Sequence, residues 1–409
     1  MWGKQRACES GFFYMRKIAA NYIITLTGKP LKNGILVLND DNVITEIIDT
    51  GGQLRDAEKI EFYNGILVPG FVNCHCHLEL SFMKERIPAG AGIDGFIDGM
   101  VHLRKEDENV ILHEIHKYDR IMASNGIVAV GDISNNSSSF ELKKKSSLFY
   151  HTFCEVFHPD EKHADDEFIK GLALYQKAKK EYNLSASIVP HAPHTVSDKL
   201  FSLIKKHAAQ TGDILCIHNQ ESATENEYFL SGTGKLYNKL KEIRKDSFAW
   251  EKKNVSSLKY VYEKLPPVNN ILFVHNTFSS QNDIETASSY FKNLFWCLCP
   301  NSNLYIENAL PDVHLLRKNK QKIVVGTDSL ASNTRLNILE ELKTISANFD
   351  NISLEEMISW ACLNGAEALN IEDIYGSFYS GKKPGVVLLE KVNIQNFKLT
   401  QESKVKVIV

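Results

Sequence analysis

The sequence has no long apolar run, since stretches such as GILVPGF at 65–71 end after a few residues. A membrane-spanning helix needs about 20 consecutive apolar residues, so we expect neither a span nor a membrane partner. The N-terminal segment also lacks an uninterrupted apolar core, so no signal peptide is predicted and residues 1–14 are expected to be an extension outside the fold. The interrupting charges are Lys4, Arg6, Glu9, Arg16 and Lys17.

The chain also lacks an excess of charge of one sign. Its 409 residues include 47 Lys+Arg and 50 Asp+Glu, which gives a formal net charge of 47 − 50 = −3. A domain that neutralises phosphates carries a basic excess, so we expect no nucleic-acid partner. With 43% hydrophobic and 24% charged residues, the composition is typical of a soluble globular protein.

Cysteine is sparse, with eight in 409 residues, which is too few for a disulfide framework. Five of them fall in apolar runs, which predicts reduced thiols and a cytoplasmic location. The C-x-C spacing of two pairs leaves metal binding as an alternative. Side chains two apart share one face of a strand, so the first pair faces away from His75 and His77, and we favour buried apolar thiols. The five are Cys74, Cys76, Cys216, Cys297 and Cys299.

Short apolar runs alternate with segments of helical period. The segment from Asp198 to Thr211, for example, follows the capping residue Ser197 and ends before Gly212. Apolar strands that alternate with helices predict parallel βα units, and eight of them predict an α/β fold with a (β/α)₈ barrel over 70–370. The segment 225–268 is long enough for an inserted lid or subdomain. The predicted strands are 71–77, 126–133, 149–157, 186–191, 213–218, 270–275, 294–299 and 322–328.

Both ends of the chain carry β-prone runs outside the predicted barrel. Residues 15–69 alternate such runs with Gly and Asn-Asp turn signals, and residues 371–409 do the same. We expect the two pieces to form one small β-sandwich domain.

Polar residues end several predicted strands. The carboxyl ends of barrel strands converge on one cavity, which is where chemistry is expected. His75 and His77 share one face of the first strand, while His218 and Asp328 end the fifth and eighth strands. Imidazole and carboxylate donors suit Zn²⁺ or Fe²⁺, so these four residues are the predicted metal ligands.

Further residues near these strand ends suit the remaining chemistry. A catalytic metal lowers the pKa of water towards about 7, and attack by that water needs a group that moves protons. Glu221 lies three residues after His218 and is our candidate, with a helix-start carboxylate as the alternative; Glu225 and Glu227 are expected on a solvated face. His275 is expected to hold the attacking water or the developing alkoxide by a hydrogen bond, with a structural role as the alternative.

The fourth strand ends in two histidines that compete for a place facing the substrate. His191 lies at the strand end and is favoured over His194.

The ordered motifs resemble those of the amidohydrolase superfamily, in its deaminase and chlorohydrolase branch. The matching segments are PGFVNCHCHLELS, PHAPHTVS, HNQES, FVHNTF, CPNSN and VVGTDSLASN, followed by YGSFYSGKKPGVVLL near the C-terminus. The resemblance implies a metal site at His75, His77, His218 and Asp328, with Glu221 transferring a proton to a ring nitrogen of the substrate. It also implies that His275 and Asp328 handle the water, and it favours a homodimer.

Members with two metals usually bridge them through a modified lysine on strand four, where this chain reads ASIVPH. We therefore expect one divalent ion, Zn²⁺ before Fe²⁺. The H-x-H-L-E segment resembles that of aminofutalosine deaminases and makes Glu79 a candidate substrate contact, with a rim residue that pairs with Arg or Lys as the alternative. Asn303 in CPNSN and Arg335 after the last barrel strand are further candidates.

The predicted activity is hydrolytic deamination of a purine-like heterocycle, with aminofutalosine or an adenosine-type thioether as the first substrates to try. A different zinc-deaminase fold uses H-x-E followed by P-C-x-x-C, and this chain has no P-C-x-x-C. Hydrolysis of a cyclic amide or a carbon–halogen bond at the same site is the alternative activity. A non-catalytic metal-binding protein is the alternative from another class.

Overall fold

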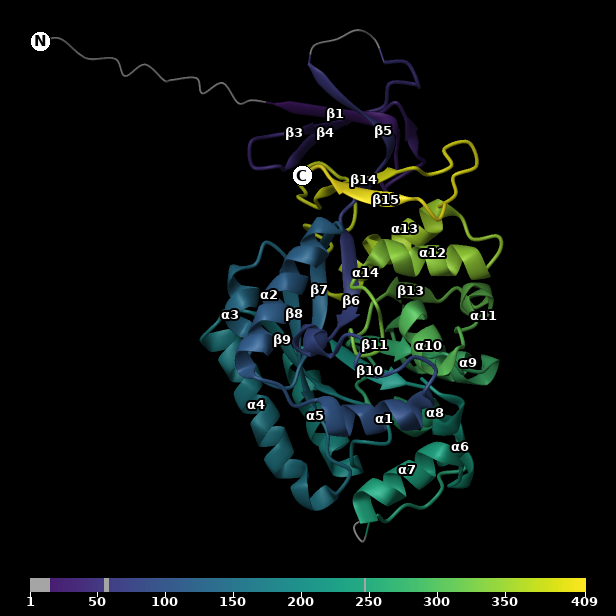
Figure 1. Cartoon of the computed structure of the whole chain (residues 1–409). Coiled ribbons are helices and arrows are strands. Elements are labelled where there is room, and N and C mark those ends of the chain that lie inside the picture. The colour runs from purple at the N-terminus through teal and green to yellow at the C-terminus, as the bar shows by residue number, and fades with distance from the viewer. Residues whose placement is uncertain (1–14, 55–58, 246–247) are drawn as a thin grey trace, which may run out of the picture.

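The computed structural model describes residues 15–54, 59–245 and 248–409, so the predicted extension 1–14 lies outside the described residues (Figure 1). The strands outside the predicted barrel are β1 (Arg16–Ile23), β2 (Leu31–Lys32), β3 (Ile35–Leu38), β4 (Ile44–Ile48), β5 (Ile60–Pro69), β14 (Val386–Glu390) and β15 (Lys404–Val407). The strands of the central part are β6 (Phe71–Cys76), β7 (Ile127–Ser134), β8 (Phe149–Val156), β9 (Ser185–Pro190), β10 (Leu215–Asn219), β11 (Asn270–His275), β12 (Asn293–Leu298) and β13 (Lys322–Val325).

Helices follow most of the central strands and surround them (Figure 1). The α-helices are α1 (Gly92–Leu103), α2 (Glu108–Ser124), α3 (Phe140–Lys145), α4 (Ala164–Lys180), α5 (Asp198–Thr211), α6 (Ala223–Ser231), α7 (Gly234–Arg244), α8 (Ser257–Val261), α9 (Gln281–Tyr290), α10 (Pro300–Glu307), α11 (Val313–Lys318), α12 (Ile338–Asn348), α13 (Leu354–Ala361) and α14 (Leu363–Ala368). Short 3₁₀ helices are η1 (Leu78–Met83), η2 (Glu161–His163) and η4 (Tyr262–Lys264).

The eight predicted central strands are confirmed, with ends that differ by up to three residues, at β13. They form two parallel four-stranded sheets, ordered β6-β7-β8-β9 and β10-β11-β12-β13. Backbone hydrogen bonds join the two sheets at both pairs of edges: the N–H of His218 donates to His191 O at 3.0 Å, and the N–H groups of Thr327 and Asp328 donate to His75 O at 3.0 Å. The carboxyl ends of all eight strands therefore face one region.

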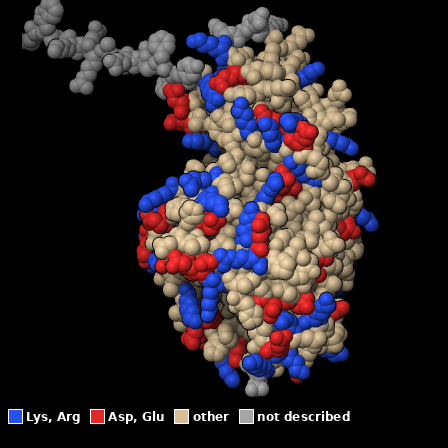
Figure 2. Space-filling view, in the orientation of Figure 1, with Lys and Arg blue, Asp and Glu red and all other residues tan. Residues whose placement is uncertain are grey.

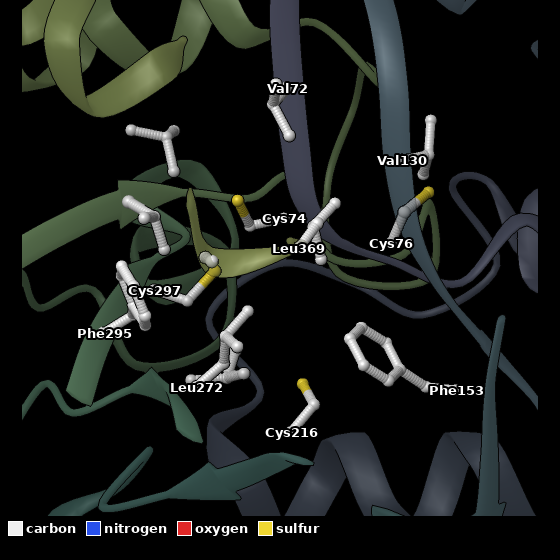
Figure 3. Close-up of a cluster of buried hydrophobic side chains, with 14 of the residues drawn as sticks. Val72, Cys74, Cys76, Val130, Phe153, Cys216, Leu272, Phe295, Cys297 and Leu369 are labelled. Atoms are coloured by element: carbon white, nitrogen blue, oxygen red, sulfur yellow. The ribbon is translucent and has the colours of Figure 1, made fainter. Parts of the chain in front are cut away.

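The core follows from the near-continuous apolar strands. Parallel strands covered by helices are buried on both faces, which explains why they read as Val, Ile and Phe runs without alternation. Cys74, Cys76, Cys216 and Cys297 lie among these apolar side chains (Figure 3). Helix α5 confirms the predicted segment, since the Ser197 hydroxyl accepts a hydrogen bond from Leu200 N and the helix ends at left-handed Gly212.

Strands from both ends of the chain form a separate sheet, as the β-prone runs indicated. Its order is β15-β14-β5-β1-β3-β4, with β2 paired to β1. Strand β5 runs parallel to β1 and antiparallel to β14, so the C-terminal hairpin adds to an N-terminal sheet. The strand β5 leads directly into β6, which joins this sheet to the central strands.

The segment 225–268 contributes helices α7 and α8 and most of α6 rather than one long helix. Tyr228, Phe229, Leu236 and Leu240 form an apolar cluster of their own. The Trp250 ring stacks on Tyr228 with 4.2 Å between centroids. The segment therefore packs through its own aromatic core, which fits the predicted insertion.

The surface carries both signs of charge. On the face seen in Figure 2, Lys and Arg side chains are interspersed with Asp and Glu, in line with the net charge of −3. Within the described ranges, no helix combines the length and the apolar character that crossing a membrane requires.

The contact between β13 and β6 yields a test of the fold. A Cβ atom added at Gly326 would lie 2.8 Å from His75 Cβ and 3.0 Å from His75 N and Cys297 Sγ. We expect Gly326→Ala to lower the free energy of unfolding by about 1–3 kcal/mol, because backbone is among the atoms that must move. Urea unfolding measures this. The control is Gly28→Ala, where no heavy atom lies within 4 Å and we expect a change below about 0.5 kcal/mol. Equal stability of the two variants would contradict the prediction.

Candidate active site

The structure brings together the four residues predicted as metal ligands. His77 Nε2 lies 3.1 Å from His75 Nε2 and 3.3 Å from His218 Nε2. Asp328 Oδ1 lies 3.5 Å from His75 Nε2 and 3.3 Å from His77 Nε2. All four donor atoms are within 4.8 Å of one another. The side chains come from β6, β10 and the segment after β13, at the carboxyl ends of the strands.

The tautomer of His218 follows from its backbone contact. His218 Nδ1 lies 2.8 Å from His191 O, and a carbonyl can only accept, so Nδ1 carries the proton. The Nε2 lone pair then points at the other donors. Burial lowers the pKa of His218 to about 4, which keeps the ring neutral. Neutral imidazoles and one carboxylate this close repel one another without a cation between them, so the set can hold a divalent metal.

Hydroxyl groups fix the carboxylate of Asp328. Ser302 and Ser332 donate hydrogen bonds to its Oδ2 at 2.7 and 2.5 Å, which leaves Oδ1 facing the histidines. Burial alone would raise the pKa of Asp328, but a hydrogen bond from His75 and the nearby His77 and His275 hold it well below its ordinary value. Its φ of 56° is strained for a non-glycine residue, and such strain is common at functional sites.

Glu221 and His275 meet beside this cluster. Glu221 Oε1 lies 3.5 Å from His275 Nε2, and both groups are within 4.8 Å of a carboxylate oxygen of Asp328. Burial, with Asp328 and Glu225 nearby, raises the pKa of Glu221 well above its ordinary value. Burial lowers the pKa of His275 to about 3. The site therefore places a carboxyl with a raised pKa beside an imidazole that stays neutral.

A cavity of about 800 Å³ opens above the cluster. His77, His218, Glu221 and Asp328 line its base, and His191 and His194 both line its wall. One further wall is apolar and belongs mainly to helix α1, from which it takes Ile93, Phe96, Ile97, Met100 and Val101. The sequence analysis missed this wall, although GFIDGMVHL at 95–103 is an apolar segment beside the metal motif.

The family assignment agrees with this geometry. The model of the amidohydrolase family matches residues 66–409, which is most of the chain. The chain belongs to the amidohydrolase family.

Individual relatives are distant but cover most of this amidohydrolase. It is 24% identical over 401 residues to a 5-methylthioadenosine/S-adenosylhomocysteine deaminase of Saccharophagus degradans, covering 92% of this chain and 84% of the relative. It is 27% identical to an aminodeoxyfutalosine deaminase of a Nitratiruptor species, covering 80% and 79%. The structure of Helicobacter pylori aminofutalosine deaminase in complex with methylthio-coformycin superposes with a TM-score of 0.78, at 22% identity over 94% and 93% of the two chains.

In this amidohydrolase Glu225 differs from expectation, and Glu79 takes the alternative role expected for it, an ion pair with an arginine. Glu225 is buried rather than solvated. It lies in the first turn of α6, and its carboxylate turns back to the preceding segment. There it accepts hydrogen bonds from Gln220 N at 2.9 Å and Glu221 N at 3.3 Å. Glu227, by contrast, is exposed as expected. Glu79 is buried but does not line the cavity; its carboxylate accepts from Asn135 N at 3.2 Å and pairs with Arg104 at 3.4 Å. Arg104 lies between Glu79 and the open space.

Two predicted substrate contacts also lie elsewhere. Arg335 is outside the cavity, with 68% of its side chain exposed and Glu340 4.0 Å away, because the Asn333 side chain accepts from the Arg335 N–H and turns the chain outward. Asn303 is buried behind His275, where its amide contacts His275 Nδ1 at 3.2 Å and Thr277 Oγ1 at 2.8 Å. It therefore holds the imidazole rather than facing the cavity.

The cysteine alternative finds no support. The seven cysteines of the described ranges are all buried and unpaired. Burial raises the pKa of Cys299 to about 11, so it stays a neutral thiol. Within the same ranges, the groups with metal-ligand spacing contain only His, Asp and Glu.

The structure contains a buried ion pair near the metal cluster, which the sequence analysis did not predict. Lys143 Nζ lies 2.6 Å from Asp132 Oδ2, and both side chains are fully buried. Asp132 Oδ1 accepts a hydrogen bond from Leu78 N at 2.7 Å, directly after His77. The pair therefore anchors the turn that follows β6. Lys143 belongs to a Lys-Lys-Lys run that reads as surface.

We expect Lys143→Met to lower the free energy of unfolding by about 3–5 kcal/mol, because it leaves the Asp132 carboxylate buried and uncompensated. Denaturant titration measures the loss. Lys145→Met is the matched control on the same helix, since Lys145 is 71% exposed and pairs with Glu141 at the surface; we expect a change below about 1 kcal/mol. A loss in Lys143→Met as small as in this control would show that the pair does not stabilise the fold.

Proposed function

We propose that the protein is a metal-dependent hydrolytic deaminase of an amino-substituted, purine-like heterocycle, which releases ammonia. The observation that carries the proposal is the convergence of Glu221, His275 and Asp328 beside a His₃Asp cluster at the base of a cavity. The relatives reported above are named deaminases of adenosine-type nucleosides and of aminodeoxyfutalosine, which supports the same chemistry. As an amidohydrolase, the chain is a hydrolase that acts on C–N bonds other than peptide bonds.

One Zn²⁺ is the metal that we propose for the cluster, with Fe²⁺ as the alternative. Three imidazole nitrogens and one carboxylate oxygen are donors that both ions accept. The strand β9 supplies no lysine, since it reads SASIVP, which supports a single ion. When bound, the ion supplies Lewis acidity that makes a water molecule a stronger nucleophile at neutral pH.

The chain's own residues supply the proton transfers. The raised pKa of Glu221 favours its protonated form, and Glu221 gives this proton to a ring nitrogen next to the carbon under attack. Asp328, whose carboxylate lies within 4.8 Å of the Glu221 and His275 side chains, would accept a proton from the attacking water. His275 Nε2 is buried, has no hydrogen-bond partner among the described residues, and lies near both carboxyl groups, so it holds the water by a hydrogen bond. The oxygen of water forms a bond to the amino-bearing carbon, and the proton taken up by Asp328 then passes to the amino group. The C–N bond breaks, ammonia leaves, and the hydroxyl proton of the addition product returns to Glu221 as the carbonyl forms.

The cavity supports a flat heterocycle with an extended substituent. Its apolar α1 wall suits a ring face or an alkyl thioether, whereas His191 and Arg104 offer polar contacts on the rest of the lining. Aminofutalosine and adenosine-type thioethers are therefore the substrates that we propose first.

The same proposal includes the finer architecture. We infer a closed (β/α)₈ barrel over 70–370, supported by the hydrogen bonds at both pairs of sheet edges. Residues 15–69 and 371–409 form the small domain. A β-sandwich there is supported by the two faces of β1, since Ile18 and Ala20 pack in one apolar cluster and Ala19 in another. A cytoplasmic homodimer completes the proposal; unpaired buried thiols support the reducing compartment.

The first test replaces the proton donor. We expect Glu221→Gln to lower kcat for ammonia release by about 10²–10⁴-fold while metal content is unchanged, because the amide cannot deliver a proton. The assay covers aminofutalosine, adenosine thioethers, guanine, cytosine and a chlorotriazine, with product identification. Glu227→Gln, on the helix α6 that follows Glu221, is the control and should keep wild-type turnover. Near-normal turnover by Glu221→Gln would remove this role, and amide or halide products would favour the alternative hydrolase.

The second test removes the metal. Chelation should abolish ammonia release, and about one equivalent of Zn²⁺ should restore it, because the three imidazoles and one carboxylate complete a single site. His77→Asn should retain little metal after the same treatment. Metal content by mass spectrometry, on the samples used for the assay, distinguishes one ion from two. Full activity in the metal-free protein would contradict the proposal, and a loaded protein that is inert towards all substrates would favour a non-catalytic binder.

A further inference from the structure

Glu155 is a buried glutamate of the cavity wall that neither the metal cluster nor the proton transfers use. It is the penultimate residue of β8, and its side chain is only 3% exposed. Its Oε2 accepts a hydrogen bond from Asn135 Nδ2 at 2.9 Å. Its Oε1 has no hydrogen-bond partner among the described residues, although Glu155 lines the cavity. One oxygen is therefore fixed by Asn135, and the other is buried at the cavity wall without a partner.

The neighbouring histidines do not satisfy this oxygen. Glu155 Oε1 lies 3.8 Å from His218 Nδ1, which is too long for a hydrogen bond. His218 Nδ1 already donates to His191 O at 2.8 Å. A buried carboxylate oxygen without a partner costs free energy, so a donor is expected to reach it from the cavity.

Asn135 holds the Glu155 carboxylate in place. Its side-chain oxygen accepts a hydrogen bond from Arg104 Nη2 at 2.6 Å, and its backbone N–H donates to Glu79. Asn135 is thus tied on three sides, and the direction of Glu155 Oε1 is set before any ligand binds. Such preorganisation is what a recognition group needs.

The position of Glu155 in the cavity indicates which part of a bound ligand would contact its side chain. The His218 ring separates Glu155, near Nδ1, from the other metal donors, which face Nε2. A heterocycle reacting at the Nε2 side, beside Glu221, reaches Glu155 with the part that is remote from the reacting carbon. In a purine nucleoside, that remote part carries sugar hydroxyl groups.

We propose that Glu155 Oε1 accepts a hydrogen bond from a sugar hydroxyl of the substrate. The enzyme would thereby select ribonucleosides over analogues that lack the 2′- or 3′-hydroxyl. This inference rests on the proposed function for the identity of the ligand. The free oxygen on the cavity wall, rather than Glu79, is the acceptor, because both oxygens of Glu79 are engaged by Asn135 and Arg104.

Binding separates this inference from the proposed chemistry. Calorimetry on the zinc-loaded Glu221→Gln protein uses adenosine and 2′,3′-dideoxyadenosine as probes. We expect adenosine to bind about 10- to 100-fold more tightly, because a hydrogen bond to a charged acceptor is lost with the hydroxyls. Adding Glu155→Gln should reduce this ratio to about threefold or less. Its amide oxygen can keep the bond from Asn135 and turns the NH₂ group towards the cavity.

Glu167→Gln, in the same Glu221→Gln background, is the matched control. Glu167 lies on α4 and pairs with Lys170 at 2.6 Å, so the ratio should stay at its original value. Equal affinity for the two probes, or a ratio that Glu155→Gln leaves unchanged, would overturn the inference even where wild-type protein releases ammonia. Discrimination that depends on Glu155, in a protein that releases no ammonia, would support the subsite and remove the deaminase proposal.

A substrate series on wild-type protein covers the case in which Glu155→Gln does not fold. Among adenosine, 2′-deoxyadenosine and 3′-deoxyadenosine, we expect the loss of one particular hydroxyl to weaken binding about 10-fold or more. Similar affinity across the series would overturn the inference.

Discussion

The site depends on the hydrogen bonds between the segment after β13 and the end of β6. The N–H groups of Thr327 and Asp328 both donate to His75 O, and they join the edges of the two sheets. This backbone carbonyl belongs to His75, whose ring is part of the metal cluster. The contact that joins the sheets therefore also places the Asp328 carboxylate beside His75 and His77. The close approach requires Gly326, where no side chain separates the strands. The same hydrogen bonds therefore determine both how the sheets join and where the metal ligands lie.

Buried polar groups around the metal cluster are also held in position by specific partners. Each one would cost free energy if left unpaired, so each is held by a partner that also fixes its direction. Ser302 and Ser332 hold Asp328, Asn303 holds His275, and the pair of Lys143 and Asp132 holds the turn after His77. Some buried atoms nevertheless lack partners among the described residues. Glu155 Oε1 and His194 Nδ1 belong to residues that line the cavity, whereas His275 Nε2 and Asn303 Oδ1 belong to residues that do not.

Periodicity predicted the eight central strands because parallel strands buried on both faces leave continuous apolar runs, and the histidines that end those runs were predicted with them. The positions of side chains beyond the strand ends were much harder to predict. Three such residues follow strand ends in the sequence, namely Glu79, Glu225 and Arg335. The direction of each side chain depends on hydrogen-bond partners that sequence spacing does not reveal. Glu225 is turned inward by the start of α6, and Glu79 by Asn135, which is 56 residues away. Left-handed residues such as Gln220 and Asp328 redirect the chain at these points, and a strand pattern cannot anticipate them.

The His218 ring couples the metal cluster to the wall of the cavity. Its Nδ1 proton is committed to the His191 carbonyl, which leaves Nε2 as a lone pair among the other donors. His191 itself lines the cavity, and its Nδ1 contacts Thr195 Oγ1 at 2.9 Å. A ligand that shifts the loop from His191 to Thr195 would therefore move the carbonyl that sets the tautomer of His218. His191 therefore has two roles: its carbonyl orients the metal ligand His218, and its side chain forms part of the cavity surface that a substrate meets. Both metal binding and substrate recognition consequently require this loop to be rigid.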